Sequence, residues 1–210
     1  MFVEPPFYDQ VAPRVGWIEA VCGSMFSGKT EELIRRLSRA ELARQQVVAF
    51  KPALDTRYHA ERVISHSRRA KPAVAVERAE QLIEPAAGAE VVGVDEAQFF
   101  DAALPEVCSY LADRGKRVIV AGLDMDFTGK PFGPMPALLA RAEYITKMHA
   151  VCMVCGQVAS YSFRLVPDAE TVLLGEQEAY EARCRRCFVE GMRAHAADAR
   201  FTPPARFSSR

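Results

Sequence analysis

Short apolar runs alternate with helical patterns along the first two-thirds of the chain. Four of these runs are predicted to be strands, at 15–22, 47–51, 90–96 and 117–124. Leucines at helical spacing predict a helix over 29–45, and a second helix is predicted over 103–114. Strands that alternate with helices indicate an α/β fold, with a mainly parallel sheet that helices cover on both faces.

Two stretches between these elements show neither the helical spacing of apolar residues nor an apolar run typical of a strand. Residues 52–72 hold prolines, histidines and charged residues, and we expect a polar loop there. The segment 122–135 is rich in glycine and proline and contains Phe127 and Phe132. It is longer than a simple connection needs to be, which predicts a functional loop.

The charge balance and the apolar content restrict the possible partners. The chain has 210 residues, of which 27 are basic and 27 acidic, so its formal net charge is zero. A polynucleotide-binding surface needs an excess of basic residues, so no nucleic-acid partner is predicted. No apolar stretch approaches the roughly 20 residues that span a bilayer, and residues 1–14 do not read as a signal peptide. We therefore expect no membrane partner and a cytoplasmic location.

A motif of phosphate-binding loops, G-x-x-x-x-G-K-[ST], stands between the first predicted strand and the first predicted helix. Its residues are Gly23, Ser24, Met25, Phe26, Ser27, Gly28, Lys29 and Thr30. The glycines allow the N–H groups of the loop to converge on phosphate oxygens at the start of a helix. Lys29 is expected to reach the β- and γ-phosphates of ATP, and Thr30 to bind Mg²⁺ through its hydroxyl. A chance glycine-rich turn is the alternative, which the flanking strand and helix disfavour.

Two acids, Asp95 and Glu96, end the third predicted strand. In P-loop proteins an acid at this place holds Mg²⁺, directly or through water, and Asp95 is our candidate. A carboxylate at Glu96 can accept a proton from an attacking hydroxyl if it lies within hydrogen-bond reach. The alternative is that both acids only end a strand. The string DEAQ (95–98) also resembles a helicase motif, but the chain is too short for two ATPase lobes and is not basic.

Four of the six cysteines form the pattern C-x₂-C…C-x₂-C, with 28 residues between the two pairs. They are Cys152, Cys155, Cys184 and Cys187. Four thiolates in two such pairs suit a closed, structural zinc site, and an inserted hairpin over about 157–174 would account for the long interval. Buried or redox-active thiols are the alternative. His149 is a less favoured ligand because all four cysteines are present, and Cys22 and Cys108 are expected in the core.

In combination, these motifs resemble the type II (zinc-containing) thymidine kinases from about residue 16 to 188. The matching segments are GSMFSGKT (23–30), KPALDTRY (51–58), DEAQFF (95–100), GLDMDFTGKPFG (122–133), KMHAVCMVC (147–155) and YEARCRRC (180–187). The resemblance implies ATP-dependent phosphorylation of the 5′-hydroxyl of thymidine and deoxyuridine, in nucleotide salvage for DNA synthesis. It also implies a RecA-like P-loop domain, a small zinc-bearing lasso domain, a homotetramer and feedback inhibition by thymidine triphosphate (dTTP).

The resemblance further implies roles for single residues. Glu96 resembles the general base of the family, and Asp55 and Arg57 match a polar pair near the phosphates, where Arg57 would offset developing negative charge. The residues that match the nucleoside site are Met25, Phe99, Leu123, Phe127, Phe132, Ser162, Thr171, Leu173, Gly175 and Tyr180. The alternative for Phe99, Phe127, Phe132 and above all Phe100 is core packing. The alternative for Tyr180 is packing beside the zinc site, and that for Asp55 and Arg57 is an exposed ion pair.

Two residues depart from the pattern that we expect in this family. Asp126 stands where a small or neutral residue is expected, and Ser162 replaces a more usual threonine but keeps the hydroxyl. Three other functions stay open from the sequence. They are a kinase of another deoxynucleoside or of a nucleoside monophosphate, a DNA-stimulated ATPase, and a zinc-ribbon binding module with a vestigial P-loop.

The chain accordingly divides into four segments. Residues 1–14 are predicted to be a flexible tail, and 15–150 to form the P-loop nucleotide-binding domain. Residues 151–190 are predicted to form the zinc-binding lasso domain, and 191–210 a C-terminal helix and tail.

Overall fold

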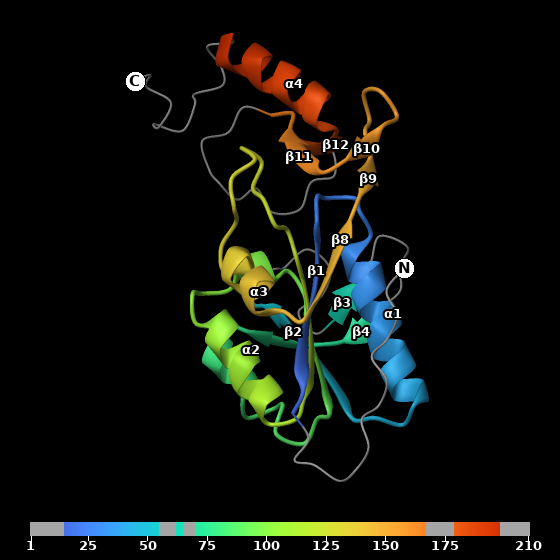
Figure 1. The fold of residues 1–210 in the computed structure, drawn as a ribbon, viewed down its shortest axis with the longest axis vertical. Helices are drawn as coiled ribbons and strands as arrows, with labels where there is room; N and C mark the ends of the chain where they lie inside the picture. Colours follow the sequence, from blue (N-terminus) through green and yellow to red (C-terminus); the bar gives the residue numbers. More distant parts are fainter. Residues whose placement is uncertain (1–14, 55–61, 65–69, 167–178, 198–210) are drawn as a thin grey trace.

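A central sheet of six strands organises the larger part of the molecule (Figure 1). The computed structural model describes residues 15–54, 62–64, 70–166 and 179–197. The sheet consists of β1 (Trp17–Gly23), β2 (Val47–Pro52), β5 (Val74–Val76), β6 (Val91–Val94), β7 (Arg117–Gly122) and β8 (Tyr144–Met148). Their order is β5-β2-β6-β7-β1-β8, and every neighbouring pair is parallel. The predicted parallel α/β sheet is confirmed.

Helices cover the two faces of this sheet (Figure 1). On one face lies α1 (Lys29–Leu42), and on the other lie α2 (Leu104–Asp113) and α3 (Met135–Arg141). Alternate residues of β7 point to opposite faces, so Val118 packs in the core on the α2 side and Ile119 in the core under α1. Two 3₁₀ helices, η1 (Ala79–Leu82) and η2 (Ala97–Phe99), complete the domain.

The cysteines outside the two pairs are core residues, as predicted. Cys22 and Cys108 are both buried in the core on the α2 side. Burial raises the pKa of Cys22 to about 11 and that of Cys108 to about 12. Both side chains are therefore neutral thiols that fill space.

The sequence prediction of a loop over 52–72 is wrong in part. The structure has two short strands there, β3 (Arg62–Ile64) and β4 (Ala70–Pro72), which pair antiparallel beside the sheet. Strands of three residues are too short to show a hydrophobic period, which explains why the pattern did not predict them. The strand predicted over 90–96 ends at Val94, so Asp95 and Glu96 lie beyond the sheet.

A smaller unit lies beyond the carboxyl ends of β1 and β8 (Figure 1). It consists of β9 (Ala150–Val151), β10 (Val158–Ala159), β11 (Tyr161–Arg164), β12 (Tyr180–Arg183) and α4 (Arg185–Ala197). We call it the lasso unit. Of the hairpin predicted over about 157–174, the structure describes residues 157–166, where β10 pairs back onto β9 and β11 pairs forward onto β12. The helix α4 also runs across residue 190, where the sequence division placed a boundary.

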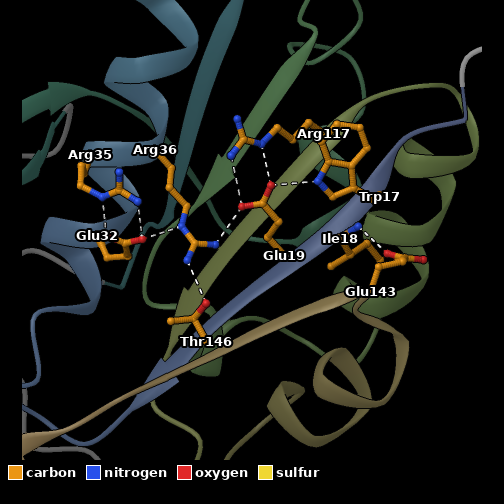
Figure 2. Close-up of polar contacts among 9 residues, drawn as sticks. All are labelled: Trp17, Ile18, Glu19, Glu32, Arg35, Arg36, Arg117, Glu143 and Thr146. Atoms are coloured by element: carbon orange, nitrogen blue, oxygen red, sulfur yellow. Dashed lines mark hydrogen bonds and ion pairs between the residues drawn. The ribbon is translucent and has the colours of Figure 1, made fainter. Parts of the chain in front are cut away.

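A buried network of charges fastens α1 to the sheet (Figure 2). Glu19, on β1, accepts hydrogen bonds from Arg36 of α1 at 2.8 Å and from Arg117 of β7 at 2.6 Å. Glu19 and Arg36 are fully buried. Arg36 also donates to Glu32 at 2.8 Å and to Thr146 of β8 at 2.9 Å. Because each charge is paired and hydrogen-bonded, the network fixes α1 against three strands at once.

None of the helices in the described ranges combines the length and the apolar character that crossing a bilayer requires.

Candidate active site

The loop between β1 and α1 has the backbone shape that phosphate binding requires. Gly23 and Gly28 have φ angles of 141° and 85°, which side-chain-bearing residues rarely adopt. A Cβ atom on Gly23 would lie 2.3 Å from the carbonyl oxygen of Met148, so only glycine fits. Inside the loop, Ser27 Oγ and Lys29 Nζ both donate to the carbonyl oxygen of Ser24 at 2.8 Å. The predicted strand–loop–helix context of the motif is confirmed.

The acid predicted to serve Mg²⁺ lies against this loop. The hydroxyl of Thr30 donates to Asp95 Oδ1 at 3.3 Å, although 65 residues separate them. Burial and the neighbouring Glu96 carboxylate raise the pKa of Asp95 to about 7. Removal of the Lys29 ammonium from water lowers its pKa, while Glu96 and Asp95 oppose that shift. A hydroxyl, a carboxylate and an ammonium therefore gather at one point, because parallel strands end at the same edge.

The candidate base is oriented by a neighbour that the sequence analysis did not single out. Glu96 has φ 50°, in the left-handed region that is costly for a non-glycine residue. Its Oε2 accepts a hydrogen bond from Gln98 Nε2 at 2.5 Å, and Gln98 Oε1 accepts from the N–H of Leu123 at 2.9 Å. A Cβ on Gly122 would lie 2.9 Å from Gln98 Oε1, so the glycine makes room for the amide. The acceptor role of Oε1 fixes the amide so that its NH₂ faces Glu96.

A second acid lies close to the loop and was likewise not predicted. Asp124, which is buried, pairs with Lys147 of β8 at 2.7 Å. This hydrogen bond raises the pKa of Lys147. The other oxygen, Asp124 Oδ1, is buried without a hydrogen-bond partner within the part of the chain that the structure describes. Asp124 ends the apolar run predicted over 117–124, whereas Lys147 lies inside β8, a strand that the sequence analysis did not predict.

Some of the apolar and aromatic side chains predicted at the nucleoside site, which we call the nucleoside wall, lie close together. The rings of Phe99 and Phe132 meet edge to face with centroids 5.7 Å apart, and both side chains are partly exposed. Leu123, after β7, is also partly exposed. Phe100 is 6 % exposed and belongs to the core, which confirms the alternative expected for that residue.

The lasso unit touches the phosphate loop and the loop over 122–134. Ser162 Oγ accepts a hydrogen bond from the backbone N–H of Met25 at 3.0 Å. The guanidinium of Arg164 lies over the Phe127 ring at 3.8 Å and donates to the hydroxyl of Tyr180 at 2.6 Å. Residues predicted at the nucleoside site are thereby brought together from three separate segments.

The four paired cysteines lie as a metal site requires. Their sulfur atoms all lie within 4.8 Å of one another, and Cys155 Sγ is 3.6 Å from Cys184 Sγ. In a tetrahedron with metal–sulfur bonds of about 2.3 Å, sulfurs lie roughly 3.8 Å apart, so the donor set fits zinc. The ring of His149 instead meets the Ser160 hydroxyl at 3.1 Å.

The protonation of these thiols also favours a cation. Burial raises the pKa of Cys152, but backbone N–H groups outweigh burial and lower it to about 6. Burial and the neighbouring thiols raise the pKa of Cys187 to about 12. Cys152 and Cys187 therefore do not ionise together unless a cation neutralises them.

Comparison with known proteins places this site in a family. The family description "Thymidine kinase" matches residues 16–188. A thymidine kinase of Rhodothermus sp. is 58 % identical over 174 residues, which cover 83 % of this chain and 82 % of the relative. Thymidine kinases of Bacteroides fragilis (strain YCH46) and Porphyromonas gingivalis (strain ATCC 33277) are each 54 % identical. The match to the Bacteroides protein covers 85 % of this chain and 90 % of that relative. The match to the Porphyromonas protein covers 83 % of this chain and 86 % of that relative.

The chain belongs to the thymidine kinase family. The matched span of this thymidine kinase family member includes the phosphate loop, the acids Asp95 and Glu96, and the four cysteines. The resemblance inferred from the sequence is confirmed.

The departure at Asp126 has a local structural reason in this thymidine kinase family member. Asp126 Oδ1 accepts from the N–H of Thr128 at 2.8 Å, from its hydroxyl at 2.7 Å and from the N–H of Lys130 at 3.0 Å. The carboxylate thus closes a tight turn at the tip of the loop over 122–134.

Some of the predicted site residues lie outside the described residues. They are Asp55, Arg57, Thr171, Leu173 and Gly175.

Proposed function

We propose that this protein transfers the γ-phosphate of ATP to the 5′-hydroxyl of thymidine, and of deoxyuridine, to form the monophosphates for DNA synthesis by salvage. The observation that carries the proposal is the junction of the phosphate loop, the Thr30–Asp95 pair and the Glu96 carboxylate at one edge of the sheet. The names of the relatives support thymidine as the acceptor.

The phosphates of ATP bind to the N–H groups of the loop over 23–30, where the start of α1 adds a favourable dipole. Lys29 is held beside the loop by the Ser24 carbonyl, and it moves from there to the β- and γ-phosphates. Asp55 and Arg57 supply further contacts near the phosphates, by the family resemblance alone.

Asp95 and Thr30 fit Mg²⁺, because a hard cation prefers oxygen ligands and both oxygens already lie within 3.3 Å of each other. When bound, Mg²⁺ neutralises charge on the phosphates. The pKa of Asp95 is raised because burial and the charge of Glu96 disfavour the ionised carboxylate. A bound cation stabilises the ionised form and so opposes both effects.

Glu96 accepts the proton of the 5′-hydroxyl while the hydroxyl oxygen bonds to the γ-phosphorus and the bond to the β,γ-bridging oxygen breaks. The hydrogen bond from Gln98 holds the carboxylate in one orientation. Catalysis therefore rests on positioning and on electrostatic stabilisation of the transferring group.

The nucleoside lies between the phosphate loop, the loop over 122–134 and the lasso unit. Phe99 and Phe132 offer an apolar edge, and Leu123, Phe127 and Tyr180 are further side chains of the wall. Main-chain groups near 171–175 read the base edge, by the family resemblance. Closure of the lasso unit over the nucleoside keeps water away from the γ-phosphate.

Zinc in the four-cysteine site has a structural role, since four sulfur ligands leave it no open position. The homotetramer, inhibition by dTTP and a location in the cytoplasm are further proposals that follow from the family resemblance and from the sequence.

Transfer of labelled phosphate from ATP to a panel of nucleosides and nucleoside monophosphates tests the proposal. We expect thymidine and deoxyuridine to be labelled in preference to deoxycytidine, purine nucleosides and monophosphates. Preferred labelling of another acceptor would contradict the substrate assignment, and ATP turnover that depends on DNA would contradict the reaction class.

A further inference from the structure

A buried guanidinium lies where the lasso unit meets the loop over 122–134. Arg164, the last residue of β11, is 3 % exposed. Its Nη2 and Nε donate to the hydroxyl oxygen of Tyr180 at 2.6 and 3.1 Å. Its central carbon lies 3.8 Å from the centroid of the Phe127 ring. One charged side chain therefore contacts two residues of the proposed nucleoside wall that come from different segments.

The contact with Phe127 holds the loop against the lasso unit. An arginine over an aromatic face is attracted by the ring quadrupole, and more strongly when water is excluded. The same loop is fixed at a second place, because Met125 packs against the ring cluster of Tyr161, Phe163 and Phe188. The position of the Phe127 ring therefore depends on the lasso unit and not only on the loop itself.

The contact with Tyr180 determines which hydrogen bond its hydroxyl can still make. A phenol oxygen has two acceptor positions and one proton to donate. Arg164 directs two N–H groups to that oxygen, so both acceptor positions are used. The O–H is left to act as a donor, and it suits an acceptor atom of a ligand, such as a carbonyl or an ether oxygen.

We propose that Arg164 is a positioning residue for nucleoside binding: it orients the Tyr180 hydroxyl as a donor to an acceptor atom of the nucleoside and holds the Phe127 ring beside it. The inference rests on the proposed function. Arg164 does not touch the reacting atoms in this arrangement. Its loss should weaken binding of the nucleoside without changing the binding of ATP or the phosphate-transfer step.

The test uses the full-length protein and compares Arg164→Lys, Tyr180→Phe and the double variant. Lysine keeps a charge near Phe127 but cannot donate two hydrogen bonds in a planar fork. Each single substitution is expected to raise KM for thymidine about tenfold, which is the effect expected from the loss of one charge-assisted hydrogen bond. The double variant should be no worse than the poorer single variant, because both remove the same interaction. The values of kcat and of KM for ATP should stay within about twofold.

Arg183→Lys is the matched control on the neighbouring strand. Arg183 also lies over a ring, that of Phe163 at 3.4 Å, but it contacts neither Phe127 nor Tyr180 by any interaction in the described residues. Its substitution should leave KM for thymidine unchanged. An equal rise in KM in this control would overturn the proposal, since the effect would then come from general loosening of the lasso unit.

Other outcomes separate the inference from the function on which it rests. The role of Arg164, but not the proposed function, would be overturned if KM for thymidine were unchanged in Arg164→Lys or in Tyr180→Phe. It would also be overturned if the rise in KM of the double variant equalled the product of the two single rises. If Arg164→Lys fails to fold, Tyr180→Phe decides the matter, because it keeps the guanidinium and removes only one hydroxyl. Wild-type protein that does not phosphorylate thymidine would instead contradict the proposed function.

Discussion

The hydroxyl oxygen of Ser162 accepts a hydrogen bond at 3.0 Å from the backbone N–H of Met25, although 137 residues separate the two in sequence. Ser162 lies on β11 of the lasso unit, and Met25 lies in the phosphate loop. This bond joins the part of the molecule proposed to hold the nucleoside directly to the part proposed to hold ATP.

Ser162→Ala leaves the N–H of Met25 without its acceptor, which costs about 1–3 kcal/mol in a buried setting. We expect KM for both substrates to rise several-fold, because the loop and the lasso unit lose a shared contact. Steady-state kinetics with each substrate varied in turn measures this. Ser162→Thr keeps the hydroxyl and is the control, and wild-type kinetics in Ser162→Ala would contradict the coupling.

Replacement of the candidate base separates chemistry from binding. Glu96→Gln removes the proton acceptor but keeps the size of the side chain, so turnover should fall by about 10²–10⁴-fold. The affinity for ATP, measured by calorimetry, should persist, because the loop over 23–30 is unchanged. Near-normal turnover in this variant would show that another group accepts the proton.

The raised pKa of Asp95 predicts a pH dependence of metal binding. A carboxyl with a pKa of about 7 is increasingly protonated below that pH, and only the ionised form binds a cation. The apparent affinity for Mg²⁺ with bound nucleotide should therefore increase between about pH 6 and 8. In Glu96→Gln the same rise should occur at lower pH, because the Glu96 charge helps to raise the pKa of Asp95. Affinity that is independent of pH in both proteins would contradict the assignment.

Loss of one cysteine ligand should release zinc. The wild-type protein is expected to contain about one zinc per chain, and Cys184→Ser should lower both the zinc content and the melting temperature. Cys108→Ser, which changes a buried thiol of the core on the α2 side, should keep the zinc. Gently purified wild-type protein without zinc, by elemental analysis, would refute the site.

The buried charge network predicts a large loss of stability from one small change. Glu19→Gln removes the buried carboxylate that Arg36 and Arg117 share, and leaves Arg36 with Glu32, so it costs about 3–5 kcal/mol of unfolding free energy. Glu106→Gln is the control, since Glu106 pairs with Arg141 on the surface and such pairs are worth less than about 1 kcal/mol. Denaturant unfolding compares the two variants. Equal, small losses would mean that water reaches Glu19.

Features that depend on neighbours along the chain could be predicted from the amino-acid sequence. The motif over 23–30 required a glycine-rich turn between a strand and a helix, and apolar runs required a parallel sheet. Paired cysteines predicted a metal site, because the spacing within each pair brings two sulfurs close together, and the four sulfurs do lie as such a site requires. Weak signals failed, as in the three-residue strands β3 and β4, where no period can be read.

Contacts between side chains that are distant in sequence became known from the folded molecule alone. The hydrogen bond from Gln98 to Glu96, the ion pair of Asp124 with Lys147 and the stacking of Arg164 on Phe127 each need a particular packing of segments. No pattern along the chain encodes such meetings, since they depend on how the carboxyl ends of parallel strands and the lasso unit converge in space. The sequence thus specified what chemistry is available, and the fold specified which groups hold it in place.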